Sequence, residues 1–402
     1  MKKAFICLIA CMLGVFSSCK PDDINDDDNN NNNNPTPDEP AAFFYEQCLF
    51  KPGDYGSKNW RIPALVCLPD GSLLAVCDKR KYNETDLPED IDIVARRSED
   101  KGRTWTEPVT IVEGQGVKKG YGDAALVVAD NGDVVCAFVG GNGLWASTES
   151  DPQRSYICRS TDGGRTWGTP TDITSQLWGS QASNSACRNY KSSFFGSGNG
   201  LRLTRGEHAG RIMFVAAMCR WNANVLDNFV VYSDDNGHTW NVSAKAFSAG
   251  DEAKLVELVD GRVLLSVRRS GARGYNISTD GGQTWGTQGL WNEMKTNACN
   301  GDMIRFSATD KGAEKNILLH SIPNSMNREN VSIFLSYDEG TTWQDPVSLF
   351  KGPSVYSSLT ILNDGTIGAF VEKNPSGACE LWYMNFSMQW LIEQQQAATK
   401  QQ

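Results

Sequence analysis

The segment that decides the fold is the octapeptide Ser160-Thr161-Asp162-Gly163-Gly164-Arg165-Thr166-Trp167, because close copies of it recur along the chain. Every copy, called a box below, fits the pattern S-x-D-x-G-x-T-W; the others are Ser98–Trp105, Ser233–Trp240, Ser278–Trp285 and Ser336–Trp343. In such a segment Asp hydrogen-bonds nearby backbone, Gly supplies a positive φ, and Trp offers a large apolar surface. Each box is therefore predicted to be a hairpin turn in which Asp holds the backbone and has no catalytic role.

The spacing of the boxes indicates the architecture. Successive boxes start 62, 73, 45 and 58 residues apart, which suits a four-stranded unit with variable loops and is too long for most helical repeats. Radial repetition of such sheets gives a β-propeller. Residues 42–391 provide room for six blades, of which five carry a box and the sixth is completed by strands from both chain ends. We predict an all-β, six-bladed β-propeller of four-stranded antiparallel blades.

Composition restricts the classes of function. With 402 residues and 40% apolar content the chain can bury a large core, and one propeller uses nearly all of it. A net charge of −10 gives no indication of a nucleic-acid partner. Nine cysteines follow Cys19, several of them inside apolar runs and none in a C-x-x-C pair. We expect buried thiols, no metal site and no cofactor.

The N-terminus has the pattern of an export signal. Lys2 and Lys3, an apolar run and two small residues precede Cys19, which is the arrangement of a bacterial lipoprotein signal peptide over residues 1–18. Residues 19–41 are rich in Asp and Asn and are predicted to be a disordered tether, and residues 392–402 a polar C-terminal tail. We expect an exported protein anchored in the bacterial outer membrane by a lipid on Cys19, facing the periplasm or the cell surface, with no other membrane contact.

Three arginines stand at comparable places in different predicted blades. Arg61 opens the first strand of the body, Arg268 ends an apolar strand, and Arg328 directly precedes another. An Arg inside an apolar strand opening requires an anionic partner, and planar guanidinium forks suit a carboxylate. The three side chains are therefore predicted to converge on the propeller axis and bind one carboxylate. Arg269 is the alternative to Arg268, because strand alternation turns only one of the two inward.

The order of these motifs resembles a known family. The Arg61-Ile62-Pro63 segment, the five boxes and the strand motifs make residues 45–388 similar to the catalytic domain of bacterial exo-sialidases (neuraminidases) of glycoside hydrolase family 33. The resemblance implies that Arg61, Arg268 and Arg328 are the arginine triad of that family. It also implies an exo-α-sialidase that releases terminal sialic acid from glycoproteins, glycolipids or oligosaccharides, without a cofactor.

The resemblance also implies the reacting groups. Tyr356 matches the nucleophilic tyrosine of the family, although Val355 and an extra Ser make the local match partial. Glu252, in a Glu-x-x-x-Val-Glu-Leu pattern, matches the glutamate that partners this tyrosine. Asp86, in the loop before the Ile-Asp strand, matches the general acid/base, with Asp90 and Asp92 as alternatives.

Three more residues are implied to support the site. Arg80, in the Asp-Lys-Arg strand end, matches an arginine that lines the sugar site, and Asp123 matches a pocket aspartate. Glu372 resembles the glutamate that braces the first arginine of the triad.

Sialic acid chemistry explains why these residue types are needed. The substrate carries a carboxylate on its anomeric carbon, which would repel an anionic nucleophile at short range. A tyrosine that stays neutral until Glu252 takes its proton avoids this repulsion, and sialidases with a Tyr nucleophile are a recognised exception among glycosidases. Asp86 would protonate the leaving oxygen and then activate water, giving net retention. This role requires Asp86 to be partly protonated near neutral pH, and therefore a partly desolvated loop.

Two alternative functions are also compatible with the sequence. One is a non-catalytic propeller that binds glycans or protein partners. The other is a member of the same family that transfers the sugar, forms an intramolecular product, or uses another nonulosonic acid.

Overall fold

Apolar strands and Gly-rich turns produce a nearly all-β chain, whose residues 41–374 and 377–400 are described by a computed structural model. The predicted signal peptide, Cys19 and the tether up to residue 40 lie outside the described residues. Within the described ranges, no helix has the length and apolar composition needed to cross a membrane. All the strands belong to the unit that begins at Pro40.

The strands of the first four blades form four antiparallel units. The first blade contains β2 (Asn59–Cys67), β3 (Leu73–Arg80), β4 (Ile91–Ser98) and β5 (Val109–Val112). The second contains β6 (Tyr121–Val128), β7 (Val134–Gly141), β8 (Gln153–Ser160) and β9 (Thr171–Asp172). The third contains β10 (Tyr190–Phe195), β13 (Ile212–Arg220), β14 (Leu226–Ser233) and β15 (Asn241–Ser248). The fourth contains β16 (Ala253–Glu257), β17 (Val263–Val267), β18 (Ser270–Ser278) and β19 (Gly289–Asn297).

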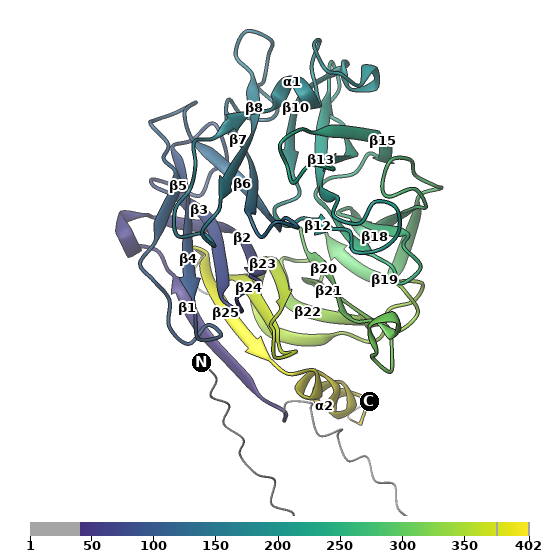
Figure 1. Cartoon of the computed structure of the whole chain (residues 1–402). Coiled ribbons are helices and arrows are strands. Elements are labelled where there is room, and N and C mark those ends of the chain that lie inside the picture. The colour runs from purple at the N-terminus through teal and green to yellow at the C-terminus, as the bar shows by residue number, and fades with distance from the viewer. Residues whose placement is uncertain (1–40, 375–376, 401–402) are drawn as a thin grey trace, which may run out of the picture. The chain divides into compact units, whose positions relative to one another are not determined.

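The fifth and sixth blades share the long strand β23 (Val347–Ile361). Its first part pairs with β22, and the fifth blade consists of that part with β20 (Asp302–Ser307), β21 (Ile317–Pro323) and β22 (Glu329–Ser336). Its second part, from Ser354, pairs with β24, and the sixth blade adds β24 (Ile367–Lys373), β25 (Glu380–Phe386) and β1 (Phe44–Phe50). Because N-terminal β1 pairs with β25 (Figure 1), both chain ends complete the sixth blade, and the predicted six-bladed propeller is confirmed.

Short elements connect the blades. Strand β11 (Gly198–Asn199) runs parallel to β6, and β12 (Leu201–Arg202) lies beside β13. The helices are α1 (Thr174–Leu177) and α2 (Met388–Thr399), with 3-10 turns at Asp54–Gly56, Ser185–Cys187 and Thr309–Lys311.

The C-terminal segment differs from the predicted polar tail. Helix α2 crosses the predicted boundary at residue 392, and the Ser387 side chain caps it by accepting from the Trp390 amide at 3.2 Å. Met388 and Leu391 are buried against strands of the fifth and sixth blades. These apolar side chains hold the helix on the propeller although most of its other residues are polar.

The apolar core lies between neighbouring blades. Along β2, Ala64 and Val66 pack toward the second blade, whereas Leu65 between them packs toward the sixth. Successive side chains of a strand point to opposite faces, so a strand covered on both faces must be apolar at every position. Comparable clusters fill the other blade junctions. This packing explains the continuous apolar runs of the sequence and closes the ring seen in Figure 1.

The boxes are turns, as predicted. In the second box, Asp162 accepts from the Thr166 amide at 2.9 Å and from the Thr166 hydroxyl at 2.6 Å. The Ser160 hydroxyl accepts from the Gly164 amide at 2.8 Å, and Gly164 has a φ of 82°. Desolvation alone would raise the pKa of Asp162, but the hydrogen bonds from Thr166 and Ser160 together outweigh it and lower that pKa to about 2. The box aspartates therefore stabilise turns.

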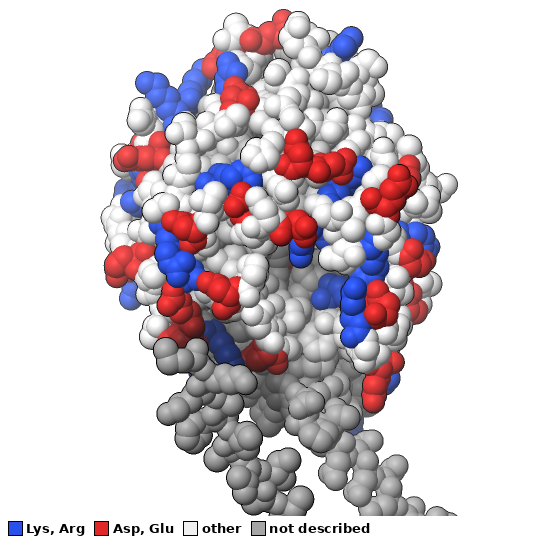
Figure 2. All heavy atoms as spheres, viewed as in Figure 1, with Lys and Arg blue, Asp and Glu red and all other residues white. Residues whose placement is uncertain are grey.

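Charged side chains of both signs cover the face shown in Figure 2. On its described part, Lys and Arg are interspersed with Asp and Glu. This face therefore shows no large patch of a single sign of charge.

Candidate active site

One cavity receives side chains from all six blades. It has a volume of about 430 Å³ and lies at the end of the ring where the inner strands begin. The charged and phenolic side chains that line it are Arg61, Asp86, Asp123, Asp251, Glu252, Arg268, Arg328 and Tyr356, with Trp145, Phe194 and Leu226 among the apolar ones. Residues that are hundreds of positions apart in the chain thus share one cavity because the blades are arranged radially.

Tyr356 and Glu252 form a hydrogen-bonded pair at the floor of this cavity. The Tyr356 phenol donates to the Glu252 carboxylate, and both residues are buried. Burial and the Glu252 charge raise the pKa of Tyr356 well above its ordinary value. Burial alone would raise the pKa of Glu252, but the Arg268 charge and the Tyr356 hydrogen bond outweigh it and lower that pKa. The proton therefore resides on tyrosine, next to a carboxylate able to accept it.

Arg268 is the cation that contacts both members of this pair. Its Nη1 donates to Tyr356 Oη at 2.9 Å and to Glu252, and its Nε lies 3.2 Å from the Asp251 carboxylate. The neighbouring Arg269 instead stacks over the Phe247 ring, with its Cζ 5.7 Å from the ring centroid. The two arginines follow the end of β17, and Arg268, not Arg269, lines the cavity.

Arg61 is held in place by a buried carboxylate. Glu372 Oε1 accepts from Arg61 Nε at 2.8 Å and from the Ile62 amide at 2.6 Å, while Oε2 accepts from the Tyr356 amide at 3.0 Å. The Arg61 Cζ lies 5.4 Å from the centroid of the Tyr356 ring. One side chain therefore fixes both an arginine of the proposed triad and the backbone of the proposed nucleophile.

A local distortion of β2 accompanies this arrangement. The register with β3 shifts between Arg61 and Ala64, and Ile62 has a φ of 65°. A β-branched residue in the left-handed region is strained, and such strain persists only where surrounding contacts hold it. The hydrogen bond from the Ile62 amide to Glu372 is one such contact.

Arg328 completes the predicted trio. It is exposed at the cavity, and its Nη2 donates to the Ala298 carbonyl at 3.3 Å. Among the described residues, no carboxylate forms an ion pair with it. Arg61, Arg268 and Arg328 therefore line one cavity together with Tyr356.

Asp86 is the only one of the three candidate loop aspartates that lines the cavity. Its side chain is 79% exposed and lies 2.7 Å from Arg80 Nη2, so the desolvation expected of a proton donor is not present here. Asp90 and Asp92 are instead paired with Lys81, at 2.9 and 2.8 Å.

Arg80 and Asp123 occupy different layers of the site. Arg80, predicted to line the sugar site, is buried behind Asp86 and does not line the cavity. Its Nη2 also contacts Asp78 at 3.3 Å. Asp123 does line the cavity, and desolvation together with the charges of Asp78 and Asp86 raises its pKa well above the ordinary value.

Sequence reasoning missed two acidic residues of this region. Asp251 lines the cavity beside Glu252, and desolvation followed by the Glu252 charge raises its pKa to about 7. Asp78 is buried under Arg80, and desolvation raises its pKa to about 7 as well, against the opposing charge of Arg80. Asp251 directly precedes Glu252 and Asp78 lies two residues before Arg80, and this proximity was the only sequence signal for a place near the site. No sequence pattern indicated that the two carboxyl groups would be desolvated.

Comparisons with known proteins show the family of the chain. Residues 71–369 match the family described as BNR repeat-like domain. The sialidase of Micromonospora viridifaciens is 35% identical over 365 residues, which cover 87% of this chain and 54% of that protein. The sialidase of Bacteroides fragilis is 30% identical over 349 residues, which cover 80% of this chain and 61% of that protein.

A solved structure extends the likeness to three dimensions. The Hadza microbial sialidase Hz136 matches with a TM-score of 0.77 and 28% identity, over 86% of this chain and 69% of that one. The chain spans less than two thirds of the length of the two curated relatives named above. It belongs to the BNR repeat-like domain family, and its predicted resemblance to bacterial exo-sialidases is confirmed.

Proposed function

We propose that this protein is an exo-α-sialidase that hydrolyses terminal sialic acid from glycoconjugates with net retention. The observation that carries the proposal is the meeting of Arg61, Arg268 and Arg328 in one cavity with the hydrogen-bonded Tyr356–Glu252 pair. A cavity with three guanidinium groups suits a carboxylate ligand. A neutral phenol beside that carboxylate suits a nucleophile that must approach it.

The arginines bind the substrate carboxylate in this proposal. Glu372 occupies Arg61 Nε, and no described protein group accepts from the two terminal nitrogens of Arg61. Arg328 has a carbonyl contact and no described ion pair, so its charge is also available. Arg268 contributes the third guanidinium while it orients the Tyr356–Glu252 pair.

The first chemical step forms a bond between Tyr356 Oη and the anomeric carbon. Glu252 accepts the phenol proton as this bond forms, and the bond from the anomeric carbon to the leaving oxygen breaks. Asp86 in its protonated form gives its proton to that leaving oxygen. The products of this step are a sialyl-enzyme intermediate, in which the phenol oxygen is joined to the anomeric carbon by a glycosidic bond, and a free aglycone alcohol.

The second step regenerates the enzyme. The Asp86 carboxylate removes a proton from water, the water oxygen attacks the anomeric carbon, and Tyr356 Oη leaves and recovers the proton from Glu252. Two displacements at one carbon give net retention. Because Asp86 is largely exposed in the structure, the bound sugar must itself cover the loop and remove water from that carboxyl.

NMR of the first-formed product tests the proposal. With an aryl α-sialoside as substrate, we expect free sialic acid to appear first as the α anomer and then to mutarotate. A sialylated acceptor sugar or an intramolecular anhydro product would instead support the transfer alternative. Binding of sialosides without any turnover would support the non-catalytic alternative.

We also propose the predicted location. The lipoprotein-type signal at residues 1–18 and Cys19 support a sialidase that is exported and lipid-anchored, so that it meets sialylated glycans outside the cytoplasm.

A further inference from the structure

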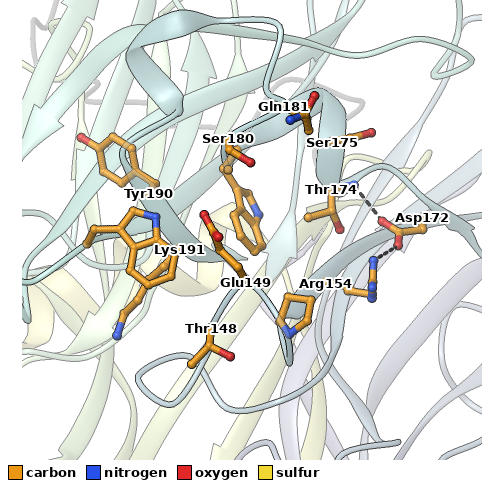
Figure 3. Close-up of a pocket in the computed structure, with 14 residues that line it drawn as sticks. Thr148, Glu149, Arg154, Asp172, Thr174, Ser175, Ser180, Gln181, Tyr190 and Lys191 are labelled. Atoms are coloured by element: carbon orange, nitrogen blue, oxygen red, sulfur yellow. Dashed lines mark hydrogen bonds and ion pairs between the residues drawn. The ribbon is translucent and has the colours of Figure 1, made fainter.

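A second cavity lies beside the catalytic one. We call it the outer cavity; it has a volume of about 430 Å³ and is bounded by the β7–β8 loop, the start of β8, the α1 region, the start of β10 and the β13–β14 turn (Figure 3). Nothing in the mechanism above uses it.

The same loop and strands contribute to both cavities through different residues. In the β7–β8 loop, Trp145 lines the catalytic cavity and Glu149 lines the outer cavity. On β10, Phe194 lines the catalytic cavity and Tyr190 lines the outer cavity. These two positions are four residues apart, or roughly 13 Å along a strand. This spacing is comparable to the length of a few sugar rings.

Aromatic rings form the apolar part of the outer cavity. Trp178 and Tyr190 belong to the core between the second and third blades. The Trp178 indole N–H donates to the Ser155 hydroxyl at 3.3 Å, and the Tyr190 hydroxyl donates to Asp227 at 2.6 Å. Both side chains are buried, so they form the apolar base of the cavity but expose little ring surface themselves. Trp221 is half-buried at this cavity and, among the described residues, belongs to no apolar cluster and contacts no other aromatic ring. Its indole has no packing role in the described core.

The polar part of the outer cavity is balanced in charge. Arg154 pairs with Asp172 at 2.8 Å, on the side opposite Tyr190 and Lys191 in Figure 3. Lys191 Nζ donates to the Trp145 carbonyl at 2.8 Å, and Glu149 is exposed with no partner among the described residues. The two cationic and two anionic side chains of this lining cancel formally, and its arginine is paired with Asp172. Uncharged hydroxyl and amide groups, which both donate and accept, fit this lining better than a carboxylate.

We propose that the outer cavity binds neutral pyranose residues of the glycan whose terminal sialic acid occupies the catalytic cavity. Pyranose rings present C–H faces that pack on aromatic rings, and their hydroxyls match the polar rim. The inference rests on the proposed function and adds that the enzyme also binds the neutral sugars that precede the terminal sialic acid in a branched or extended glycan. Binding energy gained there lowers KM for glycans without altering the chemical step.

The test compares the full chain with a Trp221→Ala variant on two substrates. For a sialylated N-glycan we expect KM to rise about five- to tenfold with kcat retained, and for an aryl sialoside both constants to stay within about twofold. A Gln181→Ala variant, which changes the polar lining, should shift the same KM in the same direction. Tyr337→Ala removes an exposed tyrosine that lines neither cavity and serves as the matched control.

A binding measurement separates this inference from the catalytic proposal. The native protein should bind the desialylated N-glycan, and Trp221→Ala should weaken that binding by a similar factor. If the native protein does not bind the desialylated glycan, or if Trp221→Ala affects both substrates equally, the outer cavity is not a glycan site. Absence of turnover on either substrate, with desialylated glycan still bound, would overturn the catalytic proposal and leave this one standing.

Discussion

The Tyr356 phenol donates its hydrogen bond to the Glu252 carboxylate although the two residues are 104 positions apart in the chain. Tyr356 comes from the sixth blade and Glu252 from the start of the fourth, and Arg268 contacts both. This triangle supplies a proton donor, a proton acceptor and a fixed positive charge in one buried place.

Tyr356→Phe removes the proposed nucleophile and leaves the ring and its packing in place. We expect kcat on an aryl sialoside to fall by at least about a thousandfold, because the covalent route is closed. Circular dichroism and thermal unfolding should show a folded protein. Tyr337→Phe, at an exposed position outside the cavity, is the control and should keep native activity. Near-native turnover by Tyr356→Phe would exclude the assignment.

Glu252→Gln removes the base while it keeps the side-chain shape. We expect a loss in kcat of about a hundredfold to ten-thousandfold, the usual contribution of a general base. Asp251→Asn is the matched comparison, because Asp251 contacts the same Arg268 but no hydrogen bond joins it to Tyr356. Its loss should be smaller by at least about tenfold, since proton transfer from the phenol is intact. Equal losses in the two variants would contradict the role given to Glu252.

Glu372→Gln tests whether the Glu372 carboxylate holds Arg61 and the backbone of Tyr356 in place. An amide cannot accept from Arg61, Ile62 and Tyr356 with both of its ends, and it leaves Arg61 without its buried counter-charge. Breaking a buried ion pair costs about 3–5 kcal/mol, so we expect a lower free energy of unfolding and a raised KM. Glu46→Gln breaks the more exposed Glu46–Lys373 pair and should cost less than about 1 kcal/mol. Urea denaturation of both variants measures the difference.

Asp78 makes stability depend on pH. Its pKa is raised to about 7 by desolvation, against the opposing charge of Arg80, whereas the ordinary value is 3.8. Between these values the folded state holds a proton that the unfolded state has lost, so stability should fall as pH rises from about 4 to about 7. Asp251, with the same direction of shift, contributes in the same sense.

The Asp78→Asn variant isolates this effect. It should flatten the decline of the melting temperature over that pH range without abolishing it, because Asp251 still titrates. A native decline that persists unchanged in Asp78→Asn would show that Asp78 is not the group responsible.

The sequence allowed the turns, the strands and the ring to be predicted because those features depend on local chemistry. Asp162 and Gly164 determine a turn in any context, and the alternation along β2 follows from strand geometry. Arg61 could be singled out because a guanidinium inside an apolar strand opening needs an anion. Arg328 is exposed, and its place in the trio followed from the family resemblance.

The remaining features depend on how loops cover strands. Arg80 stands at a strand end, where a ligand-binding residue is expected. The loop that carries Asp86 covers it, so Arg80 is buried and pairs with Asp86. The desolvation of Asp251 and Asp78 likewise arises from neighbouring blades and has no sequence pattern. Trp221 resembled any other turn residue until its position at the outer cavity was known.

Trapping the covalent intermediate tests the central claim most directly. In an Asp86→Ala variant, an aryl sialoside with a good leaving group needs no acid to form the sialyl-tyrosine intermediate, but water is no longer activated to break it. After acid quenching, peptide mass spectrometry should find one sialyl residue attached to Tyr356. An adduct on another residue, or substrate consumed at a normal rate with no adduct in Asp86→Ala, would contradict the account.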